Sequence, residues 1–241
     1  MKKYKVIACK VMMREMYGLA AQNENEIDIL WIKQALHNTP DLLREQVQKA
    51  IDMTELEDEG YDAIILGYCL CSNGIVGLRS KEIPIVVPRG HDCITMLLGS
   101  KERYREIFDS HDGGIYWYSP GWIEQSLQPG RERYEKAIME YTEKYGEDNA
   151  QFLMEMEQGW MKEYNCALYV DWDTLPNDEY IKYTKECAEY LGWKYRREQG
   201  SSSLIRDLFS GKWDDDKFLI IPPGKTIKPS YNENVIAVDE C

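Results

Sequence analysis

The sequence has no long apolar run, no cluster of basic residues and no paired CxxC motif, and each absence excludes a class of protein. The longest uncharged apolar stretch, from Ala63 to Leu70, is far shorter than the roughly 20 residues that a membrane-spanning helix needs. The N-terminal residues also lack the apolar core of a signal peptide. We therefore expect a cytoplasmic protein with no membrane partner.

Positive charge is scarce, because 29 Lys and Arg stand against 42 Asp and Glu and leave a formal net charge of −13. Nucleic-acid backbones and anionic membranes are bound mainly through clustered Lys and Arg. The composition therefore argues against nucleic acid as the main partner. With 44% hydrophobic residues in 241, the chain can bury the core of one large domain or of two small ones.

The seven cysteines are spread along the chain. An even number packed into a short secreted chain would indicate a disulfide framework, and this set fits neither condition. In a reducing compartment, clustered cysteines more often indicate metal binding or thiol chemistry.

Apolar runs, helical periodicity and turn residues alternate along the chain. We expect strands over residues 4–8, 27–32, 63–66, 83–87, 115–118, 167–170, 193–197, 218–221 and 235–238. We expect helices over 12–22, 39–52, 95–110, 178–191 and 201–209, one or two helical turns over 75–81, and two helices, broken near Gly146, over 129–164. This order predicts an α/β protein with mainly parallel sheets and helices on both faces, Rossmann-like and in one or two lobes. A boundary near Pro120 would give an N-terminal α/β unit (1–120), and a helical insert followed by a second α/β unit (121–241).

Three expected strands end in chemically capable residues: the first at Cys9, the third before Cys69 and Cys71, and the fourth before His91 and Cys93. Ligands of open α/β sheets bind outside the carboxyl ends of the strands, so we expect these side chains to converge. Zinc takes Cys and His ligands, and iron–sulfur clusters take Cys thiolates. Cys69 and Cys71 are alternate residues of an extended segment, so both could reach one ion.

The residues beside these cysteines each have two interpretations. His91 is a ligand or a general acid/base, or else a polar loop residue bonded to a backbone carbonyl. Arg89 lowers a thiol pKa or holds a substrate anion, or else is a solvated charge. Asp92 takes part in the chemistry or caps the following helix. Each cysteine could also be a small buried hydrophobe, as we expect for Cys166 and Cys187.

Two turns are candidate substrate-binding segments. Asn73 and Gly74 follow the third strand, and Ser201, Ser202 and Ser203 open a helix after a strand. A helix that begins in this way points N–H groups and hydroxyls at an anion, so we expect the serines to bind a phosphate or carboxylate in the same cleft. The alternatives are an ordinary turn at Asn73-Gly74 and helix capping by the serines.

Four stretches carry a resemblance to a known family: LGYCLCSNGIVGL, VPRGHDCITMLLGSKERY, YWYSPGWIE and LFSGKWDDDKFLIIPPG. Over nearly its whole length the chain resembles an uncharacterised bacterial and archaeal domain-of-unknown-function family, number 1638, whose genes often lie beside corrinoid-dependent methyltransferases. The family pattern is matched at Cys9, Cys71, His91, Asp92 and Cys93, whereas position 69, a cysteine here, is frequently glycine in the family. The resemblance implies one-carbon metabolism and a three-thiolate site, with His91 as the fourth group or the fourth position open.

Three functions are compatible with these observations. The one we favour is a zinc or iron–sulfur protein that serves corrinoid-dependent methyl transfer, with a corrinoid protein or methyltransferase as partner and an unidentified small-molecule substrate. The second is a metal-free thiol enzyme in which Cys93 is the nucleophile, His91 the base and Arg89 the anion-holding group. The third is a non-catalytic accessory that binds a corrinoid protein or its cofactor.

Overall fold

The computed structural model describes residues 1–34, 36–57, 59–172 and 176–239. The chain divides into two compact units, one made of residues 1–105 and 201–241 and the other of residues 106–200. The second unit is therefore an insertion into the first. This division differs from the boundary expected near Pro120. The units are determined by strand pairing between segments that are distant in sequence.

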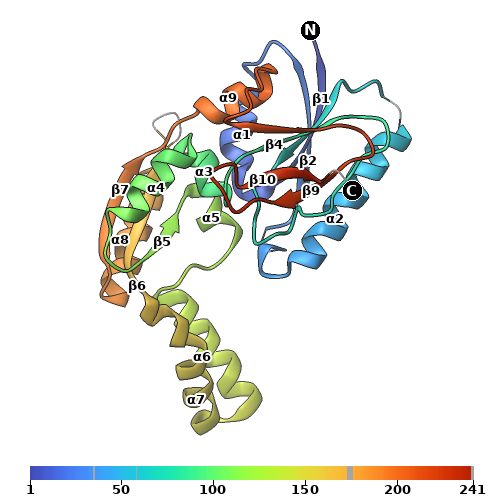
Figure 1. Cartoon of the computed structure of the whole chain (residues 1–241). Helices are drawn as coiled ribbons and strands as arrows, with labels where there is room; N and C mark the ends of the chain where they lie inside the picture. Colours follow the sequence, from blue (N-terminus) through green and yellow to red (C-terminus); the bar gives the residue numbers. More distant parts are fainter. Residues whose placement is uncertain (35, 58, 173–175, 240–241) are drawn as a thin grey trace. The chain divides into compact units, whose positions relative to one another are not determined.

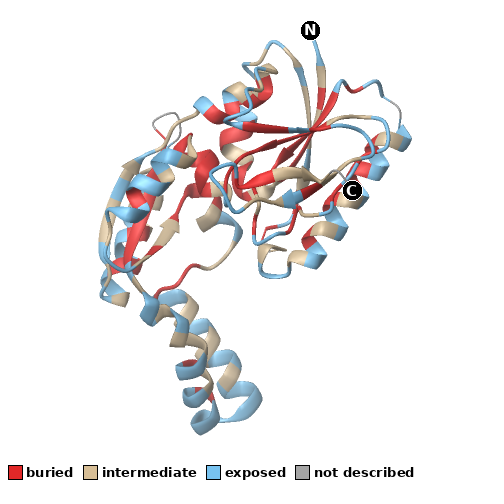
Figure 2. Cartoon of the chain, in the orientation of Figure 1, coloured by how far each residue is buried: buried red, intermediate tan, exposed pale blue. Residues whose placement is uncertain are grey.

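The first unit is built on a five-stranded sheet. Its strands are β1 (Lys3–Cys9), β2 (Glu26–Ile32), β3 (Ala63–Gly67), β4 (Ile85–Pro88) and β8 (Phe218–Ile221). Their order is β2-β1-β3-β4-β8, with the first four parallel and β8 antiparallel to β4 (Figure 1). Every residue of β3 and β4 is buried (Figure 2). Continuous apolar runs such as theirs are typical of parallel strands that are covered on both faces.

Helices cover both faces of this sheet. The helix α2 (Pro40–Glu57) packs Leu43, Val47 and Ile51 on a core cluster that includes Ile7 and Ile64. The other face carries α1 (Met13–Ala20) and α9 (Ser203–Ser210), which contact each other. The single-turn helices η1 (Lys10–Met12) and η2 (Leu36–Asn38) follow β1 and β2. The Rossmann-like α/β class predicted from the sequence is confirmed.

Two helical predictions for the first unit are wrong. No helix forms over 75–81, because the chain passes through turns there and Gly77 has a φ of 82°. The helix expected over 95–110 is two helices, α3 (Cys93–Leu98) and α4 (Lys101–Asp109), because Gly99 adopts a left-handed conformation that ends α3. The short strand β9 (Thr226–Pro229), which pairs with β10 (Ile236–Asp239), was not predicted because it has no apolar run.

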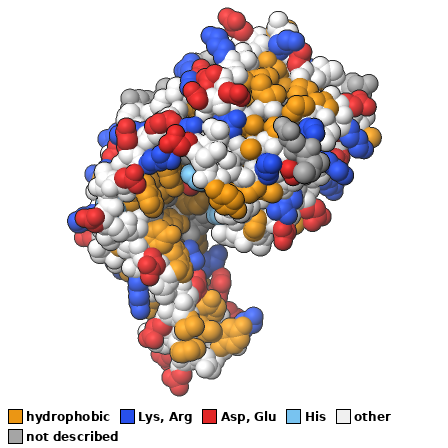
Figure 3. All heavy atoms as spheres, in the orientation of Figure 1, with side chains coloured by type: hydrophobic (Ala, Val, Ile, Leu, Met, Phe, Trp, Pro, Cys, Tyr) orange, Lys and Arg blue, Asp and Glu red, His pale blue; other side chains and the backbone are white. Residues whose placement is uncertain are grey.

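The second unit has its own parallel sheet, in the order β5-β6-β7. Its strands are β5 (Gly114–Tyr118), β6 (Tyr164–Asp171) and β7 (Lys194–Gln199), and its helical elements are α5 (Pro120–Gln125), α6 (Arg131–Tyr145), α7 (Glu147–Glu157), η3 (Gln158–Glu163) and α8 (Asp178–Leu191). The break expected near Gly146 separates α6 from α7. All of α6 is described and none of its residues is buried, and Figure 3 shows hydrophobic side chains at the surface of the α6–α7 hairpin. Among the described helices, none is both long and apolar enough to cross a bilayer.

Candidate functional site

The order of strands in the first unit determines where a ligand can bind. From β1 the chain steps to β2 on one side, whereas β3 and β4 lie on the other side of β1. Open α/β sheets leave a crevice at such a switch point, outside the carboxyl ends of the strands. Cys9 is the last residue of β1, and residues 68–71 follow β3 directly. The cysteine loops therefore lie where this topology favours a ligand.

The loops that follow β3 and β4 are hydrogen-bonded to each other. The Leu70 N–H donates to the Gly90 carbonyl at 2.9 Å, and the Cys71 N–H donates to the His91 carbonyl at 2.8 Å. These bonds continue the pairing of the two strands beyond their ends. Cys71 is consequently held beside the segment that carries His91 and Cys93.

A left-handed turn follows β3. Cys71, Ser72 and Asn73 have φ angles of 45°, 56° and 64°, a conformation that costs an L-residue about 1–2 kcal/mol. The Gly74 N–H donates to the Cys71 carbonyl at 2.9 Å, and Arg44 of α2 donates to the Asn73 carbonyl at 3.2 Å. These contacts give Asn73 and Gly74 a structural role, while their predicted part in substrate binding stays a prediction. Strain of this kind gathers at functional sites, and here it sets the position of Cys71.

The turn also separates Cys69 from Cys71. Cys71 packs with Tyr68 in the core cluster beneath α2. Cys69 lies instead against Gly90, where any side chain at position 90 would collide with its sulfur and with Thr95. The regular alternation of an extended segment ends at Cys71, so the two thiols make different contacts.

Tyr68 is electrostatically coupled to Cys9, Cys71 and Cys93. Burial, and then the charges of these three groups when ionised, raise the pKa of Tyr68. Cys93 is coupled in the same way to Cys71 and Cys9. The three thiols, which come from three strand ends, are therefore electrostatically coupled to one another and to Tyr68. Their convergence on one metal ion stays a prediction.

Burial raises the pKa of each of these thiols, that of Cys71 to about 12, and those of Cys9 and Cys93 above their ordinary value. Hydrogen bonds act against burial, since the Val11 N–H and the Tyr68 hydroxyl lower the pKa of Cys9 and the Cys69 N–H lowers the pKa of Cys71. Within the described ranges, no three Cys, His, Asp or Glu side chains are arranged to hold a metal ion. The raised pKa values keep the three thiols neutral at neutral pH.

Tyr68 is a site residue that the sequence analysis missed. Its side chain is 3% exposed. Its hydroxyl interacts with the Cys9 sulfur, and this interaction lowers the pKa of Cys9 and raises that of Tyr68. The available signal was a polar hydroxyl directly after a buried strand at the ligand-binding edge.

Asp92 and His91 have different surroundings. Asp92 caps α3, because its Oδ1 accepts from the Ile94 N–H at 2.9 Å and its Oδ2 from the Tyr104 hydroxyl at 3.3 Å. Burial raises the pKa of Asp92. His91 is exposed and contributes its carbonyl to the bond with Cys71. Capping accounts for Asp92, and the side chain of His91 is accessible to a ligand.

Arg89 is buried and bonded to backbone carbonyls. Its Nε donates to the Asp215 carbonyl at 2.6 Å, and its Nη1 donates to the carbonyls of Asn234 (3.2 Å) and Ile236. A carboxylate oxygen of Asp215 lies 4.0 Å from Nη2. These bonds tie the end of β4 to the C-terminal segment. They account for the burial of Arg89, and its predicted part in holding an anion stays a prediction.

The serine turn before α9 contacts the far end of α3. The Ser201 N–H donates to the Leu97 carbonyl at 2.9 Å, and the Ser203 hydroxyl donates to the Gly99 carbonyl at 3.4 Å. The Ser202 hydroxyl accepts from Arg206 at 2.9 Å. These contacts are local and lie at the carboxyl end of α3, whereas Cys93 begins that helix. The structure therefore supplies a packing role for the serines, and anion binding by them stays a prediction.

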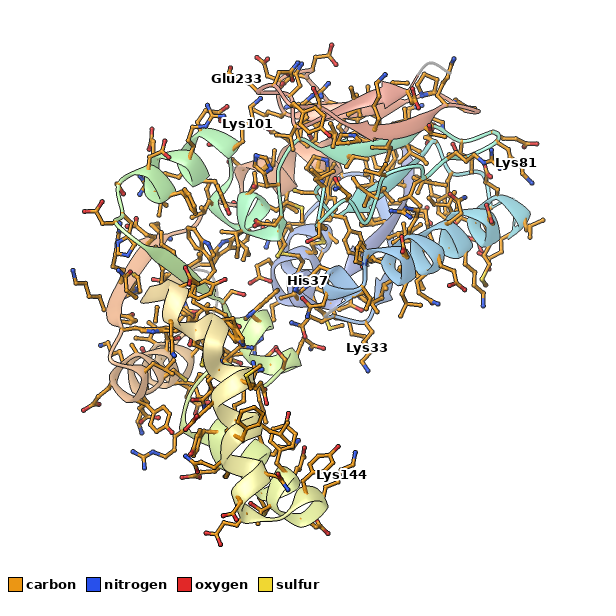
Figure 4. All side chains as sticks on the ribbon, turned by 60° about the horizontal axis from the view of Figure 1, so that its bottom comes forward. Lys33, His37, Lys81, Lys101, Lys144 and Glu233 are labelled. Atoms are coloured by element: carbon orange, nitrogen blue, oxygen red, sulfur yellow. The ribbon has the colours of Figure 1, made fainter. Side chains whose placement is uncertain are left out.

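His37 is a second residue that the sequence analysis missed. It lies in η2, between β2 and α2 (Figure 4). Burial lowers its pKa, and the Asp92 carboxylate acts in the opposite direction, which places His37 within electrostatic reach of Asp92. The rule that led to Cys9 and Cys93 applies equally to the end of β2, and would have led to His37.

Comparison with known proteins gives a single relationship. Searches of the curated proteins and of the solved structures found no match. A family model described as "Protein of unknown function (DUF1638)" matches residues 31–209, well over half of the chain. The matched range includes the loops that carry Cys71 and Cys93. The chain belongs to this family, DUF1638.

Proposed function

We propose that the carboxyl edge of the first unit's sheet is a cysteine-based metal centre that holds zinc or an iron–sulfur cluster. The ligands would be Cys9, Cys71 and Cys93, with His91 as a fourth ligand or with one position open. The observation that carries the proposal is the electrostatic coupling of three thiols from three strand ends with Tyr68, in the loops beside the switch point.

The chemistry of the donor groups fits such a centre. Soft thiolates are the preferred ligands of zinc and of iron–sulfur clusters. N–H groups already bond to the sulfurs of Cys9 and Cys71, and donors of this kind stabilise ligating thiolates. Binding would release protons from thiols whose pKa is raised, and rotation about their Cα–Cβ bonds would turn the sulfurs toward one point. Metal binding is therefore expected to weaken as the pH falls.

The setting we propose is corrinoid-dependent methyl transfer in the cytoplasm, with a corrinoid protein or methyltransferase as partner, as the family resemblance implies. A bound zinc ion would activate a thiol or a water, and a cluster would supply an electron or bind substrate. The chain's own residues position the ligands. Asp92 caps α3 and so holds Cys93 at its start, and the left-handed turn holds Cys71.

A metal-free thiol enzyme has less support. An activated nucleophilic cysteine needs a lowered pKa, whereas burial raises the pKa of Cys93. Arg89, the expected source of positive charge, is bonded to backbone carbonyls. This alternative would require both features to change when substrate binds.

The test is metal content after anaerobic purification, comparing the wild type with Cys93→Ser and with Cys166→Ser. We expect the wild type to contain stoichiometric zinc, or iron and sulfide, and Cys93→Ser to lose it with little change in melting temperature. Cys166 is buried in β6 and outside the thiol cluster, so Cys166→Ser should keep the metal and melt lower. A Cys93→Ser protein that melts lower but keeps its metal content would contradict the proposal, as would a metal-free wild type.

A further inference from the structure

The second unit contains a cavity of about 730 Å³ that is lined by the first turns of α6 and by the C-terminal half of α8. Small-molecule sites in proteins usually have volumes of about 300–1,000 Å³. Gly130, which precedes α6, also lines this cavity, and a Cβ atom at this position would lie 2.8 Å from the Cys187 sulfur of α8. The absence of a side chain at Gly130 therefore allows the two walls of the cavity to pack closely.

Four carboxylates line the cavity, Glu132 and Glu135 from α6 and Glu186 and Glu189 from α8. All four residues are exposed. Among the described residues, three of these side chains have no ion pair and no side-chain hydrogen bond, and Glu186 has one ion pair, with Lys182 at 3.8 Å. Like charges that share a cavity repel one another, so a cationic ligand would be favoured there.

The cavity already holds one cationic group, which belongs to the chain itself. The Arg131 guanidinium lies 5.4 Å from the centre of the Tyr190 ring, and both residues line the cavity. This distance is typical of a cation–π interaction. A second tyrosine, Tyr183, also lines the cavity. The lining therefore combines carboxylates with aromatic rings, which is the combination that favours organic cations.

We propose that this cavity binds a linear polyamine, a small molecule in which short methylene chains join several ammonium groups. The carboxylates are paired at i and i+3 on each helix, where Cβ atoms lie about 5–6 Å apart, and successive ammonium groups of a polyamine have a similar spacing. The described residues hold no three acidic, Cys or His side chains arranged around a metal ion, so the carboxylates suit an extended cation better than a single ion. This binding site lies within the second unit and does not depend on the proposed metal centre.

The experiment measures the affinity of the full chain for spermidine by isothermal titration calorimetry at low ionic strength. The wild type is compared with Glu132→Gln/Glu135→Gln and with the matched control Glu140→Gln/Glu143→Gln. The control residues are exposed and lie on the same helix with the same spacing, but do not line the cavity. We expect the first variant to bind about tenfold more weakly and the control to bind as the wild type does. All three proteins should melt at similar temperatures, because the substituted side chains are exposed.

Two further measurements separate specific binding from general attraction to an acidic protein. Arg131→Met should bind spermidine about threefold more tightly, because it removes a competing cation from the Tyr190 ring. Mg²⁺ should bind the wild type more weakly than spermidine does.

Equal weakening in the two double variants would overturn the proposal, because both lose the same charge. A wild type that does not bind spermidine, an Arg131→Met protein that binds it more weakly, or a wild type that binds Mg²⁺ equally well would also overturn it. None of these results depends on the metal content of the protein, so the failure of this site and the failure of the metal centre are distinguishable.

Discussion

Polar side chains at the two edges of the first unit's sheet differ in how they are hydrogen-bonded and ion-paired. At the amino edge the side chains form a bonded network: Lys2 with Asp62, Lys3 with Glu26 and Glu59, Lys5 with Asp28, and Tyr61 with Asp28 and Glu59. At the carboxyl edge, the raised pKa values of Cys71 and Cys93 keep these thiols neutral and, within the described residues, the buried hydroxyl of Thr95 has no partner. Unpaired buried groups and strained backbone lower stability, and they are retained where function requires them. The contrast supports the carboxyl edge as the proposed functional site.

Arg89 is the exception to this contrast, since it lies at the carboxyl edge and its side chain is hydrogen-bonded to backbone carbonyls. Arg89→Met would leave backbone carbonyls without donors, so we expect the free energy of unfolding to fall by about 2–4 kcal/mol with metal content unchanged. Urea denaturation and metal analysis measure the two effects. The exposed Arg79 is the control, and Arg79→Met should stay within about 0.5 kcal/mol of the wild type. Normal stability with lost metal or anion binding would assign Arg89 to the site.

The left-handed turn offers a smaller test of the strain at this edge. Ser72 is exposed and has a φ of 56°, which glycine adopts without steric penalty. Ser72→Gly removes the strain of the left-handed backbone but increases the conformational entropy of the unfolded chain, which offsets part of this gain. The net effect should be a rise of about 0.5–1 kcal/mol in the free energy of unfolding. Asn73→Gly should change it less, because asparagine already tolerates this conformation. Guanidinium denaturation of both variants measures which of them gains more free energy of unfolding. A destabilised Ser72→Gly protein would show that the turn is not strained at this residue.

The smallest effect is expected at the amino edge. A hydrogen bond from Lys2, followed by one from the Lys3 N–H, holds the pKa of Asp62 below its ordinary value of 3.8. A depressed folded-state pKa contributes stability above the unfolded pKa, and this contribution is lost as the pH falls through the folded value. Asp62→Asn should therefore reduce the loss of melting temperature between neutral pH and about pH 3, and added salt should narrow the difference. Identical pH profiles would mean that this exposed pair contributes nothing, as many do.

Local features of the sequence determined the elements of the fold and the loops of the site. The apolar run of β8 has the same bounds, Phe218–Ile221, in the prediction and in the structure. One of the two interpretations of Asp92 from the sequence is a helix cap, and Asp92 is the N-cap of α3. The cysteine loops were found because strand ends can be located from apolar runs, and the ends of parallel strands meet at one edge of a sheet. Each of these inferences depends on residues that are close in sequence.

Only the tertiary structure decided which strands pair and which polar groups remain unsatisfied. β5 pairs with β6, whose first residue is 46 positions after the last residue of β5, and β8 returns to β4 across the whole inserted unit. Such choices depend on total packing and loop closure, which local periodicity does not encode. The left-handed turn at Cys71 arises in the same way, because the surrounding segments impose its backbone conformation.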